Sequence, residues 1–262
     1  MRIVVITGAS SGVGLATSKY FAQMGDKVYG LARKSFNEDG IISKICDVTK
    51  KEDCQTVAKE IIDAEGRIDV LINNAGFGVS GSIENSNVDD VKRMFDVNFF
   101  GAVNMTQAVL PFMRENGGGK ILHTSSVASV IPIPFQSFYS ATKSSLDIYA
   151  KALRLETSPY NIQVCNVLLG DTKTAFTAHR EKAKADMGTV YEDTVARSIA
   201  KMEHDETHGK DPITAAKAMY KMSVKKKMSP TKTVGAGYKM IVLLQKILPT
   251  KFMLWVVKKL YC

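Results

Sequence analysis

Apolar runs and amphipathic segments alternate along the first two thirds of the chain. Short runs rich in Val and Ile predict strands at 2–7, 28–32, 41–46, 68–73, 120–124 and 162–168. Between them, apolar residues recur at helical spacing, which predicts helices at 13–24, 51–64, about 88–115 and 137–158. Pro111 should bend or end the last part of the third helix, because proline has no backbone N–H to donate. This alternation is typical of an α/β fold, in which helices cover both faces of a doubly wound parallel sheet.

The rhythm weakens after residue 168. Residues 178–211 are polar and charged with little apolar periodicity, and we expect them to form a mobile substrate lid with Gly209 near its hinge. An ordinary exposed helical excursion is the alternative. Since no Pro-, Ser- or Gly-rich linker and no internal repeat divides the chain, residues 1–262 are predicted to form a single domain.

The C-terminal segment, residues 232–262, is predicted to be a helical extension that is both apolar and basic. Pro249 divides it into two short helices, and neither reaches the roughly 20 apolar residues of a membrane span. Three interpretations stay open. The pair could rest on anionic lipid at a membrane periphery, cap an apolar substrate cavity, or pack on its own domain or a second subunit.

The charge of the chain is concentrated at this end. The formal net charge is +9, yet the first 211 residues carry 24 basic and 26 acidic side chains. The last 51 residues hold eleven lysines and no Asp or Glu. The positive charge therefore does not indicate that the whole domain binds nucleic acid.

The cysteines and the first residues favour the cytoplasm. Four widely spaced cysteines form no CxxC or zinc pattern, which is typical of reduced thiols. The first strand follows the initial Met-Arg directly, without the apolar h-region of a signal peptide.

A glycine-rich turn joins the first predicted strand to the first helix. Gly8, Gly12 and Gly14 permit a tight turn, a close approach of backbone to pyrophosphate, and close helix–strand packing. The N-terminus of the helix then offers free N–H groups to the phosphates. Strand before and helix after make this a dinucleotide site of the Rossmann type.

The end of the second predicted strand indicates which dinucleotide is bound. Enzymes that use NAD usually carry an acid there, which accepts a hydrogen bond from the ribose 2′-hydroxyl. This chain has Ala32, followed by Arg33 and Lys34. A guanidinium can bind a 2′-phosphate bidentately, so NADP(H) is predicted in preference to NAD(H).

Tyr139 and Lys143 are the candidate chemical groups. They stand at i and i+4 on a predicted helix, hence on one face and one turn apart. A lysine ammonium near a phenol favours the phenolate and lowers the tyrosine pKa. Ser126, thirteen residues before Tyr139, closes a strand segment at the end of the sheet where such folds bind ligands.

His204 and His208 are also spaced i, i+4, as in some zinc sites. The glutamate that a zinc protease needs beside the first histidine is displaced by one residue, and the segment is polar throughout. We expect a solvated helix or flap and no metal.

Together these motifs resemble the short-chain dehydrogenase/reductase family, in its single-domain branch of ~250 residues. The resemblance covers about residues 2–176 and rests on TGxxxGxG at 7–14, YxxxK at 139–143, and the segments 47–48, 73–76 and 170–174 with Asn98 and Ser126. The stretch 170–176 also looks like that of 17β-hydroxysteroid dehydrogenases.

The resemblance implies four catalytic roles. Tyr139 exchanges a proton with the substrate oxygen, and Ser126 hydrogen-bonds and orients that oxygen. Lys143 holds the nicotinamide ribose and lowers the tyrosine pKa, while Asn98 supports a water that links Lys143 to solvent. Hydride passes between nicotinamide and the carbonyl carbon, so no metal is needed.

The resemblance also implies a cofactor site that lines one cleft, with Asp47 and Val48 beside the adenine and Thr172 and Thr174 at the carboxamide and phosphates. Its expected members are Gly8, Ser10, Ser11, Gly12, Val13, Gly14, Arg33, Lys34, Asp47, Val48, Asn74, Ala75, Gly76, Tyr139, Lys143, Gly170, Thr172 and Thr174.

Some positions depart from the family pattern. Leu169 stands where the family often has Pro, and Thr172 where it has Val or Ile. Ser11 stands where many NADP-dependent members carry Arg or Lys, so recognition of the 2′-phosphate would rest on Arg33.

The predicted function is an NADP(H)-dependent oxidoreductase that interconverts a carbonyl and a secondary alcohol. Phe135, Phe138 and Phe176 near the expected site, with the apolar tail, favour a lipophilic substrate such as a steroid, a retinoid or another apolar ketone. The resemblance implies a homo-oligomer. The alternative is a catalytically silent NADP(H)-sensing regulator or scaffold, which the intact Ser126, Tyr139 and Lys143 argue against.

Overall fold

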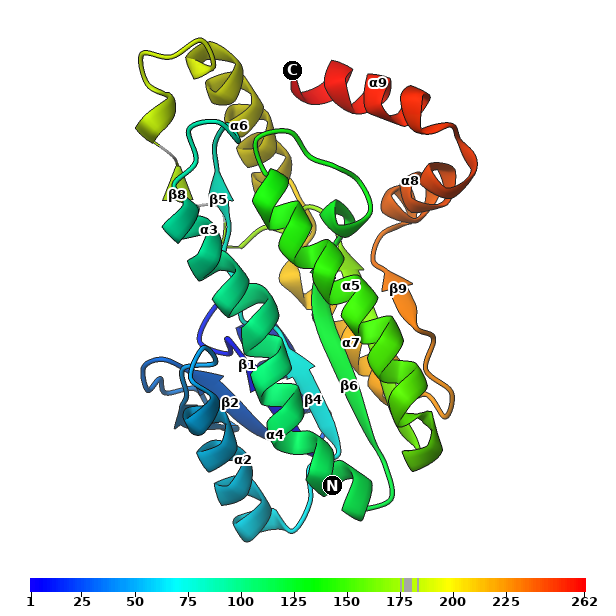
Figure 1. Cartoon of the computed structure of the whole chain (residues 1–262). Coiled ribbons are helices and arrows are strands. Elements are labelled where there is room, and N and C mark those ends of the chain that lie inside the picture. The colour runs from blue at the N-terminus through cyan, green and yellow to red at the C-terminus, as the bar shows by residue number, and fades with distance from the viewer. Residues whose placement is uncertain (175, 177–180, 183) are drawn as a thin grey trace.

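Seven parallel strands form the centre of the molecule. The computed structural model describes residues 1–174, 176, 181–182 and 184–262. The strand order is β3-β2-β1-β4-β6-β7-β9, and the sheet reverses direction of growth between β1 and β4 (Figure 1). The strands are β1 Ile3–Thr7, β2 Lys27–Ala32, β3 Ile41–Ile45, β4 Val70–Asn73, β6 Gly119–Ser126, β7 Ile162–Leu169 and β9 Thr231–Thr233. The predicted doubly wound parallel sheet is confirmed.

Helices cover both faces of this sheet because each has one apolar side. On one face lie α2 Lys51–Glu65, α4 Gly101–Glu115 and α5 Ser137–Thr157, whose inward residues join the strands in one buried cluster. On the other face lie α1 Gly12–Gln23 and α7 Pro212–Ser223, which share a second cluster with the opposite strand surfaces. Every residue of β1 and β4 is buried, as expected for strands covered on both faces.

The long helix expected at 88–115 consists of three parts. α3 Val88–Phe95 runs into a π-helical turn over Asp96–Phe100, and α4 follows. Pro111 lies inside α4 and does not end it, since the helix continues to Glu115. The π turn is the more important irregularity, because it carries the expected site residue Asn98 into the interior.

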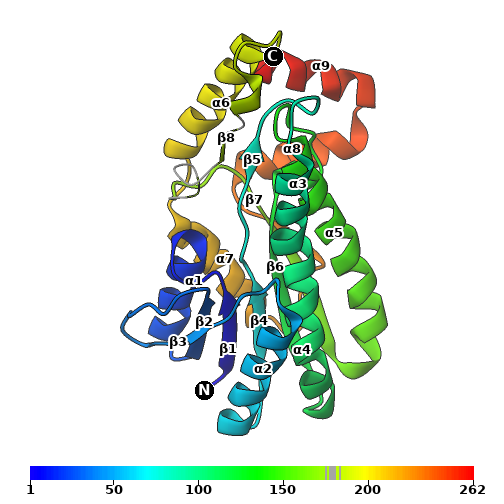
Figure 2. The same cartoon turned by 60° about the vertical axis from the view of Figure 1, so that its left-hand side comes forward.

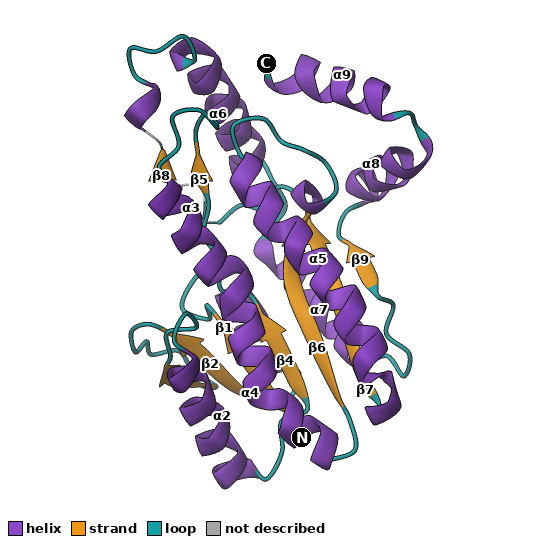
Figure 3. Cartoon of the chain, in the orientation of Figure 1, coloured by secondary structure: helices purple, strands orange, loops and turns teal. Residues whose placement is uncertain are grey.

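The region after β7 is more regular than its sequence indicated. α6 Glu192–Thr207 has a buried face of Val195, Ile199 and Met202 at i, i+4 and i+7. This apolar spacing was not anticipated in the expected lid at 178–211. Residues 178–180 and 183 of that lid lie outside the described residues. Lid residues Glu181–Lys182 form β8, which pairs with β5 Val79–Ser80 in a small second sheet above the main one (Figure 3).

The last part of the chain leaves the sheet after β9, so the expected extension from residue 232 begins inside that strand. It forms α8 Ala236–Ile247 and α9 Thr250–Tyr261, separated at Pro249 as predicted. The two helices form an arm that projects from the body and turns back toward α6 (Figures 1 and 2). Among the described residues, no helix is long and apolar enough to cross a membrane.

Candidate active site

The turn between β1 and α1 has the backbone geometry that its glycines predict. Gly8 and Gly12 have φ values of 64° and 54°, a region that side chains disfavour. At Gly14 the reason is packing, since a Cβ would lie 2.1 Å from the carbonyl oxygen of Gly8. Any other residue there would push the helix away from the turn.

The N-terminus of α1 is open to a ligand. Ser11 occupies the N-cap without a side-chain hydrogen bond, and the first turn contains no acidic residue. The N–H groups of this turn therefore have no capping side chain, and an anion can take that place. Thr174 reaches the same point from the far side, because its Cβ lies 3.5 Å from where a Gly12 Cβ would be. The structure thus brings residues 8–14 and Thr174 together.

Thr7, which the expected site omitted, holds the turn against the end of β4. Its hydroxyl accepts hydrogen bonds from the backbone N–H of Asn74 at 2.9 Å and of Ala75 at 3.0 Å. The Asn74 amide donates to the carbonyls of Thr7 and Gly8, and its Oδ1 accepts from Thr124 Oγ1 at 3.1 Å. Thr7 precedes the glycines directly, so its place in the motif was the available signal.

The ends of β2 and β3 lie next to each other because these strands pair in parallel, with Ala32 opposite Ile45. Arg33 and Lys34 are exposed just beyond β2, and Asp47 follows β3. Burial raises the pKa of Asp47, but hydrogen bonds from Thr49 and the nearby charges of Lys50 and Arg33 outweigh it and hold the pKa below its usual value.

Val48 follows Asp47 in the sequence, and its side chain packs against the start of α4. A Cβ at Gly101 would lie 2.6 Å from Val48 Cγ2, so the glycine allows helix and side chain to meet. The end of β2 carries no acidic residue. The charge of Arg33 is close enough to Asp47 to lower the pKa of its carboxyl group.

Lys143 is a buried cation beneath the carboxyl ends of the strands. Only 5% of the residue is exposed, and Nζ donates to the carbonyl of Thr124 at 2.9 Å. Burial lowers the Lys143 pKa to about 8 because the charged form loses its water. The ammonium lies 5.7 Å from the centre of the Tyr139 ring, one helical turn away on α5.

Tyr139 lies beside this cation on α5, and Ser126 follows Thr124, the partner of Lys143, by two residues on β6. Ser126 is the last residue of β6 and its hydroxyl accepts the N–H of Ala128 at 3.1 Å. The Tyr139 ring is half-buried and packs on Phe176, with ring centres 5.8 Å apart. A Cβ at Gly78 would meet the same Phe176 ring at 3.0 Å. Phe135, expected nearby, instead packs against the apolar face of α6.

Asn98 holds the backbone after β4 against α5. Its Oδ1 accepts from Phe77 N at 3.0 Å, and its Nδ2 donates to Phe77 O at 2.9 Å and Thr142 Oγ1 at 3.1 Å. Gly76 lies within this contact, since a Cβ there would be 3.0 Å from Asn98 Oδ1 and 3.6 Å from Lys143 Nζ. The structure therefore brings Asn98, Lys143 and the 76–78 backbone together.

A buried histidine lies beneath Lys143 on β6. Burial, and secondarily the charge of Lys143, lower the pKa of His123 to about 3. Its Nδ1 is 3.3 Å from Asn73 Nδ2, and its ring packs edge-on against Tyr149. A neutral imidazole here adds no positive charge next to the lysine.

The loop after β7 is fixed by two later segments. Thr172 forms a bridge with Lys210, and Thr172 Oγ1 donates to the carbonyl of Gly170 at 2.9 Å. From the arm, Tyr238 packs directly on Gly170, where a Cβ would lie 2.1 Å from the ring. The Tyr238 hydroxyl accepts from Asp171 N at 3.1 Å and donates to the Asp171 carboxylate. Neither contact was expected, because the partners are distant in the sequence.

The described part of the expected lid is attached to the loop after β5. Asp186 is buried and accepts from Ser82 N at 3.0 Å, Ser82 Oγ at 2.5 Å and Asn85 Nδ2 at 2.9 Å. Burial raises the pKa of Asp186, but these hydrogen bonds outweigh it and keep the pKa below its usual value. The Asp186 carboxylate thus joins the two segments beside the site through hydrogen bonds.

His204 and His208 lie at the end of α6 with their rings stacked 4.3 Å apart. His208 Nδ1 is 2.8 Å from the carbonyl of His204, so it is engaged within the helix end. Within the described ranges, no group of three His, Cys, Asp or Glu side chains could hold a metal ion.

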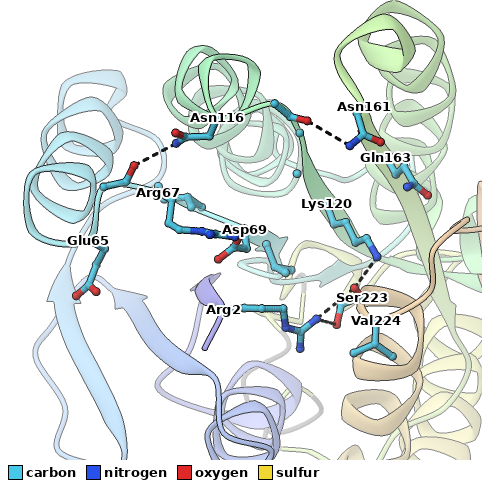
Figure 4. Close-up of a pocket in the computed structure, with 16 residues that line it drawn as sticks. Arg2, Glu65, Arg67, Asp69, Asn116, Lys120, Asn161, Gln163, Ser223 and Val224 are labelled. Atoms are coloured by element: carbon cyan, nitrogen blue, oxygen red, sulfur yellow. Dashed lines mark hydrogen bonds and ion pairs between the residues drawn. The ribbon is translucent and has the colours of Figure 1, made fainter.

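A cavity of about 650 Å³ lies at the opposite end of the sheet, where the parallel strands begin (Figure 4). Its charged side chains already have partners within the chain. Arg2 pairs with Asp26 and donates to Ser223, and Lys120 donates to the carbonyl of Ser223 at 2.8 Å. Ligands of doubly wound folds bind at the carboxyl ends of the strands, so this cavity is not the candidate site.

The carboxyl end of the sheet fits a dinucleotide. It offers an uncapped helix N-terminus for the phosphates, glycines that leave room for a backbone approach, exposed cations beyond β2 and a buried ammonium beneath Tyr139. When bound, a nicotinamide ring would supply or accept a hydride there.

Comparison with known proteins agrees with this geometry. The family model described as short chain dehydrogenase matches residues 2–185. The chain is 40% identical over 227 residues to a 3-ketodihydrosphingosine reductase of Bacteroides thetaiotaomicron, covering 86% of this chain and 84% of that one. It is 34% identical over 184 residues to the NADPH-dependent 1-acyldihydroxyacetone phosphate reductase of Saccharomyces cerevisiae, covering 66% and 62%. A solved short-chain dehydrogenase from Streptomyces avermitilis superposes with a TM-score of 0.83 at 27% identity, covering 94% and 93%.

Proposed function

The chain belongs to the short-chain dehydrogenase family, and we propose that it is an NADP(H)-dependent reductase of a lipophilic ketone, with Tyr139 as its proton donor. The family binds a nicotinamide cofactor and acts on small molecules. The identity of the cofactor, the substrate and the roles of individual residues are the content of the proposal.

The observation that carries the proposal is the placement of Tyr139 beside a buried cation. Lys143 is nearly inaccessible to water, so its charge acts on the phenol through a medium that screens it weakly. The ammonium favours the phenolate that remains when Tyr139 gives its proton to the substrate oxygen. Ser126, at the end of β6, orients that oxygen with its hydroxyl.

Asn98 also has a positional role in this proposal, beside the water-supporting role that the resemblance implies. Its side-chain amide is committed to Phe77 and Thr142, so in this proposal Asn98 is a positioning residue. It keeps the 76–78 backbone against α5, which fixes the wall of the cofactor cleft next to Lys143.

Tyr139→Phe tests the chemical assignment. We expect kcat to fall by about 10²–10⁴-fold, the usual contribution of a positioned acid or base, while NADPH binding measured by fluorescence is retained. Tyr160→Phe, at an exposed ring just before the start of β7 and so at the opposite end of the sheet, is the matched control and should leave kcat unchanged. Full turnover by Tyr139→Phe would refute the enzyme assignment as drawn.

The preference for NADP(H) rests on Arg33. It is exposed beyond β2, close enough to Asp47 to lower that pKa, and no acid competes for the ribose. A guanidinium at this place binds a 2′-phosphate in a bidentate manner. Arg33→Ala should therefore raise the KM for NADPH about 10-fold or more, a loss typical of a charge-assisted hydrogen bond, and leave the KM for NADH unchanged. Arg114→Ala is the surface control, and equal effects of Arg33→Ala on both cofactors would contradict NADP(H) selectivity.

A lipophilic ketone is supported by the surroundings of Tyr139 and by two relatives. Phe176 packs on the Tyr139 ring, and the apolar arm is attached to the loop that closes the site. The names of two relatives mention a 3-ketodihydrosphingosine and a 1-acyldihydroxyacetone phosphate, which are ketones on long lipid chains. The first substrate to test is a long-chain 3-keto amino lipid.

The substrate test compares ketones that share the reacting carbonyl and differ in chain length. Oxidation of NADPH, followed at 340 nm, should show kcat/KM rising with the length of the apolar chain, because each buried CH₂ contributes about 0.8 kcal/mol. If short hydrophilic ketones were reduced with the same kcat/KM, a lipophilic substrate would be excluded, and the assignment of Tyr139 as proton donor would be unaffected.

A further inference from the structure

Exposed large apolar side chains are concentrated in the arm, residues 236–261. Within it only Val242 and Val257 are buried. Trp255 is 57% exposed and Ile247 is 69% exposed. Nine large apolar side chains of the arm lie in solvent: Met240, Ile241, Leu243, Leu244, Ile247, Phe252, Leu254, Trp255 and Leu260. Large apolar side chains exposed in this number on one segment of a folded domain indicate a site of interaction.

Both ends of the arm are held in place. At its start, Tyr238 packs on Gly170 and bonds to Asp171. At its end, Tyr261 joins the small apolar cluster under α6. Burial, and secondarily the nearby acids, raise the pKa of Tyr261 to about 12, in keeping with this enclosed position. The arm is therefore attached to the body at both of its ends (Figure 2).

The arm is also basic. Five lysines of the arm are exposed, and they flank the apolar residues on both helices: Lys239, Lys246, Lys251, Lys258 and Lys259. From residue 212 to the C-terminus the chain contains no Asp or Glu, so the acids near the arm come from other segments and act on its two attached tyrosines. The occupant of this surface must accept both apolar side chains and positive charge.

We propose that the arm is a docking surface for an anionic lipid bilayer. Lysines at the edge of an apolar helix face reach the phosphates while their stems lie along the acyl chains. Tryptophan favours the boundary between headgroup and acyl chain, which is where Trp255 would lie, and the apolar ring of Phe252 would enter the acyl region beside it. Each helix has 12 residues, so the arm lies on the bilayer and does not cross it.

A second copy of the chain fits this surface less well. Two arms face to face would bring ten lysines together without any acid from residues 212–262 to pair with them. Like charges in that arrangement repel, whereas an anionic bilayer attracts each of them.

Docking by the arm would also place the candidate active site toward the lipid. Tyr238 contacts the residue that directly follows β7, so the arm lies at the carboxyl end of the sheet. The cavity among Arg2, Lys120 and Ser223 lies at the far end. Binding to lipid requires no turnover, so this proposal stands apart from the proposed reductase activity and is tested without it.

Trp255 is the only tryptophan of the chain and serves as a native probe. Its emission is measured with the full chain while vesicles of phosphatidylcholine alone, or with one third phosphatidylglycerol, are added at low and at high salt. We expect a blue shift with the anionic vesicles at low salt, together with quenching by lipids brominated on the acyl chain. Neutral vesicles should give little change, and high salt should weaken binding because it screens the lysines.

Two charge-reversal variants distinguish the effect of the arm's lysines from the effect of the net charge of the chain. Lys246→Glu/Lys258→Glu/Lys259→Glu alters the arm, and Lys225→Glu/Lys226→Glu/Lys227→Glu makes the same change in charge at the opposite end of the molecule. The control lysines are exposed, and the carbonyls of Lys225 and Lys226 accept from Lys120 and Gln163 at the start of β6 and β7. Each lysine near an anionic surface contributes about fivefold to binding, so the arm variant should bind on the order of 100-fold more weakly. The control variant should stay within a few-fold of the parent chain.

A second pair of variants tests the apolar contribution. Ile247→Ser/Leu254→Ser removes exposed apolar surface from the arm, and Ile148→Ser/Leu155→Ser removes it from α5. Only the first should reduce vesicle binding, and circular dichroism should show both folded. The proposal would be overturned if both charge-reversal variants lost vesicle binding equally, or if the parent chain did not bind anionic vesicles at low salt. A concentration-dependent Trp255 blue shift without vesicles, with dimers in sedimentation, would assign the arm to a second copy instead.

Discussion

Gly170→Ala tests how tightly the arm is joined to the site. A Cβ at this position would lie 2.1 Å from Cε2 and 2.3 Å from Cδ2 and Cζ of Tyr238. Carbon atoms at optimal contact are about 3.5–4.0 Å apart, so the ring would have to move by more than an ångström. The ring is not free to do so, because its hydroxyl bonds both the N–H and the carboxylate of Asp171.

The expected cost follows from these two effects. Overpacking costs about 1–3 kcal/mol of unfolding free energy, and a buried polar group that loses its partner costs about 1–3 kcal/mol more. Gly170→Ala should therefore destabilise the chain by about 2–6 kcal/mol. Burial raises the pKa of Asp171, and losing the tyrosine hydroxyl would leave that carboxylate less well solvated.

A double-mutant cycle with Tyr238→Ala provides the assay. Unfolding in urea gives the free energy of the parent, both single variants and the double variant. Removing the ring makes room for the methyl group, so the double variant should lose at least about 1 kcal/mol less than the sum of the single losses. Strictly additive losses would show that Tyr238 and Gly170 do not pack as described.

Three further predictions concern groups inside the fold. Thr7→Val should cost about 2–4 kcal/mol in urea unfolding because two backbone N–H groups lose their acceptor, and Thr7→Ser should retain most of the stability. The Lys143 ammonium should titrate near pH 8 in NMR of the unliganded protein, because burial lowers its pKa to about 8; a midpoint above pH 10 would contradict its burial. The buried His123 has a pKa of about 3 in the folded state and about 6.5 when unfolded. The stability that the neutral imidazole contributes is therefore complete above pH 6.5 and is lost as the pH falls toward 3. The difference in unfolding free energy between the parent and His123→Gln should shrink by about 2–3 kcal/mol from pH 7 to pH 4.5. A constant gap would place an accessible histidine there.

The central sheet could be predicted because its signals are local. Buried parallel strands appear as apolar runs, and the glycine turn after β1 is read from residues that are neighbours in the sequence. The same holds for Tyr139 and Lys143, which one helix places on one face. Predicted strand and helix boundaries in this part agree with the structure to within a few residues.

The parts that escaped prediction depend on distant contacts. The π turn at Asp96–Phe100 leaves no mark in helical periodicity, yet it directs Asn98 toward Phe77 and Thr142. α6 has a sparse apolar face because its partners include Tyr261 at the other end of the chain's last helix. Patterns read along one segment cannot reveal what a segment 60 residues later will cover.

The loop at residues 170–172 is held by contacts with two distant segments. The chain cannot replace Gly170 because Tyr238 occupies the space of its side chain, and Thr172 pairs with Lys210 ahead of α7. The loop that completes the site is thus shaped by the start of the arm and by the segment that follows α6. The arm contacts the loop after β7 through Tyr238 and contacts α6 through Tyr261. A ligand bound to the arm could therefore affect the site through either contact. A bilayer bound to the arm would therefore act on the loop after β7, which carries the expected cofactor residues Gly170, Thr172 and Thr174, so lipid should alter the KM for the cofactor as well as the KM for the ketone.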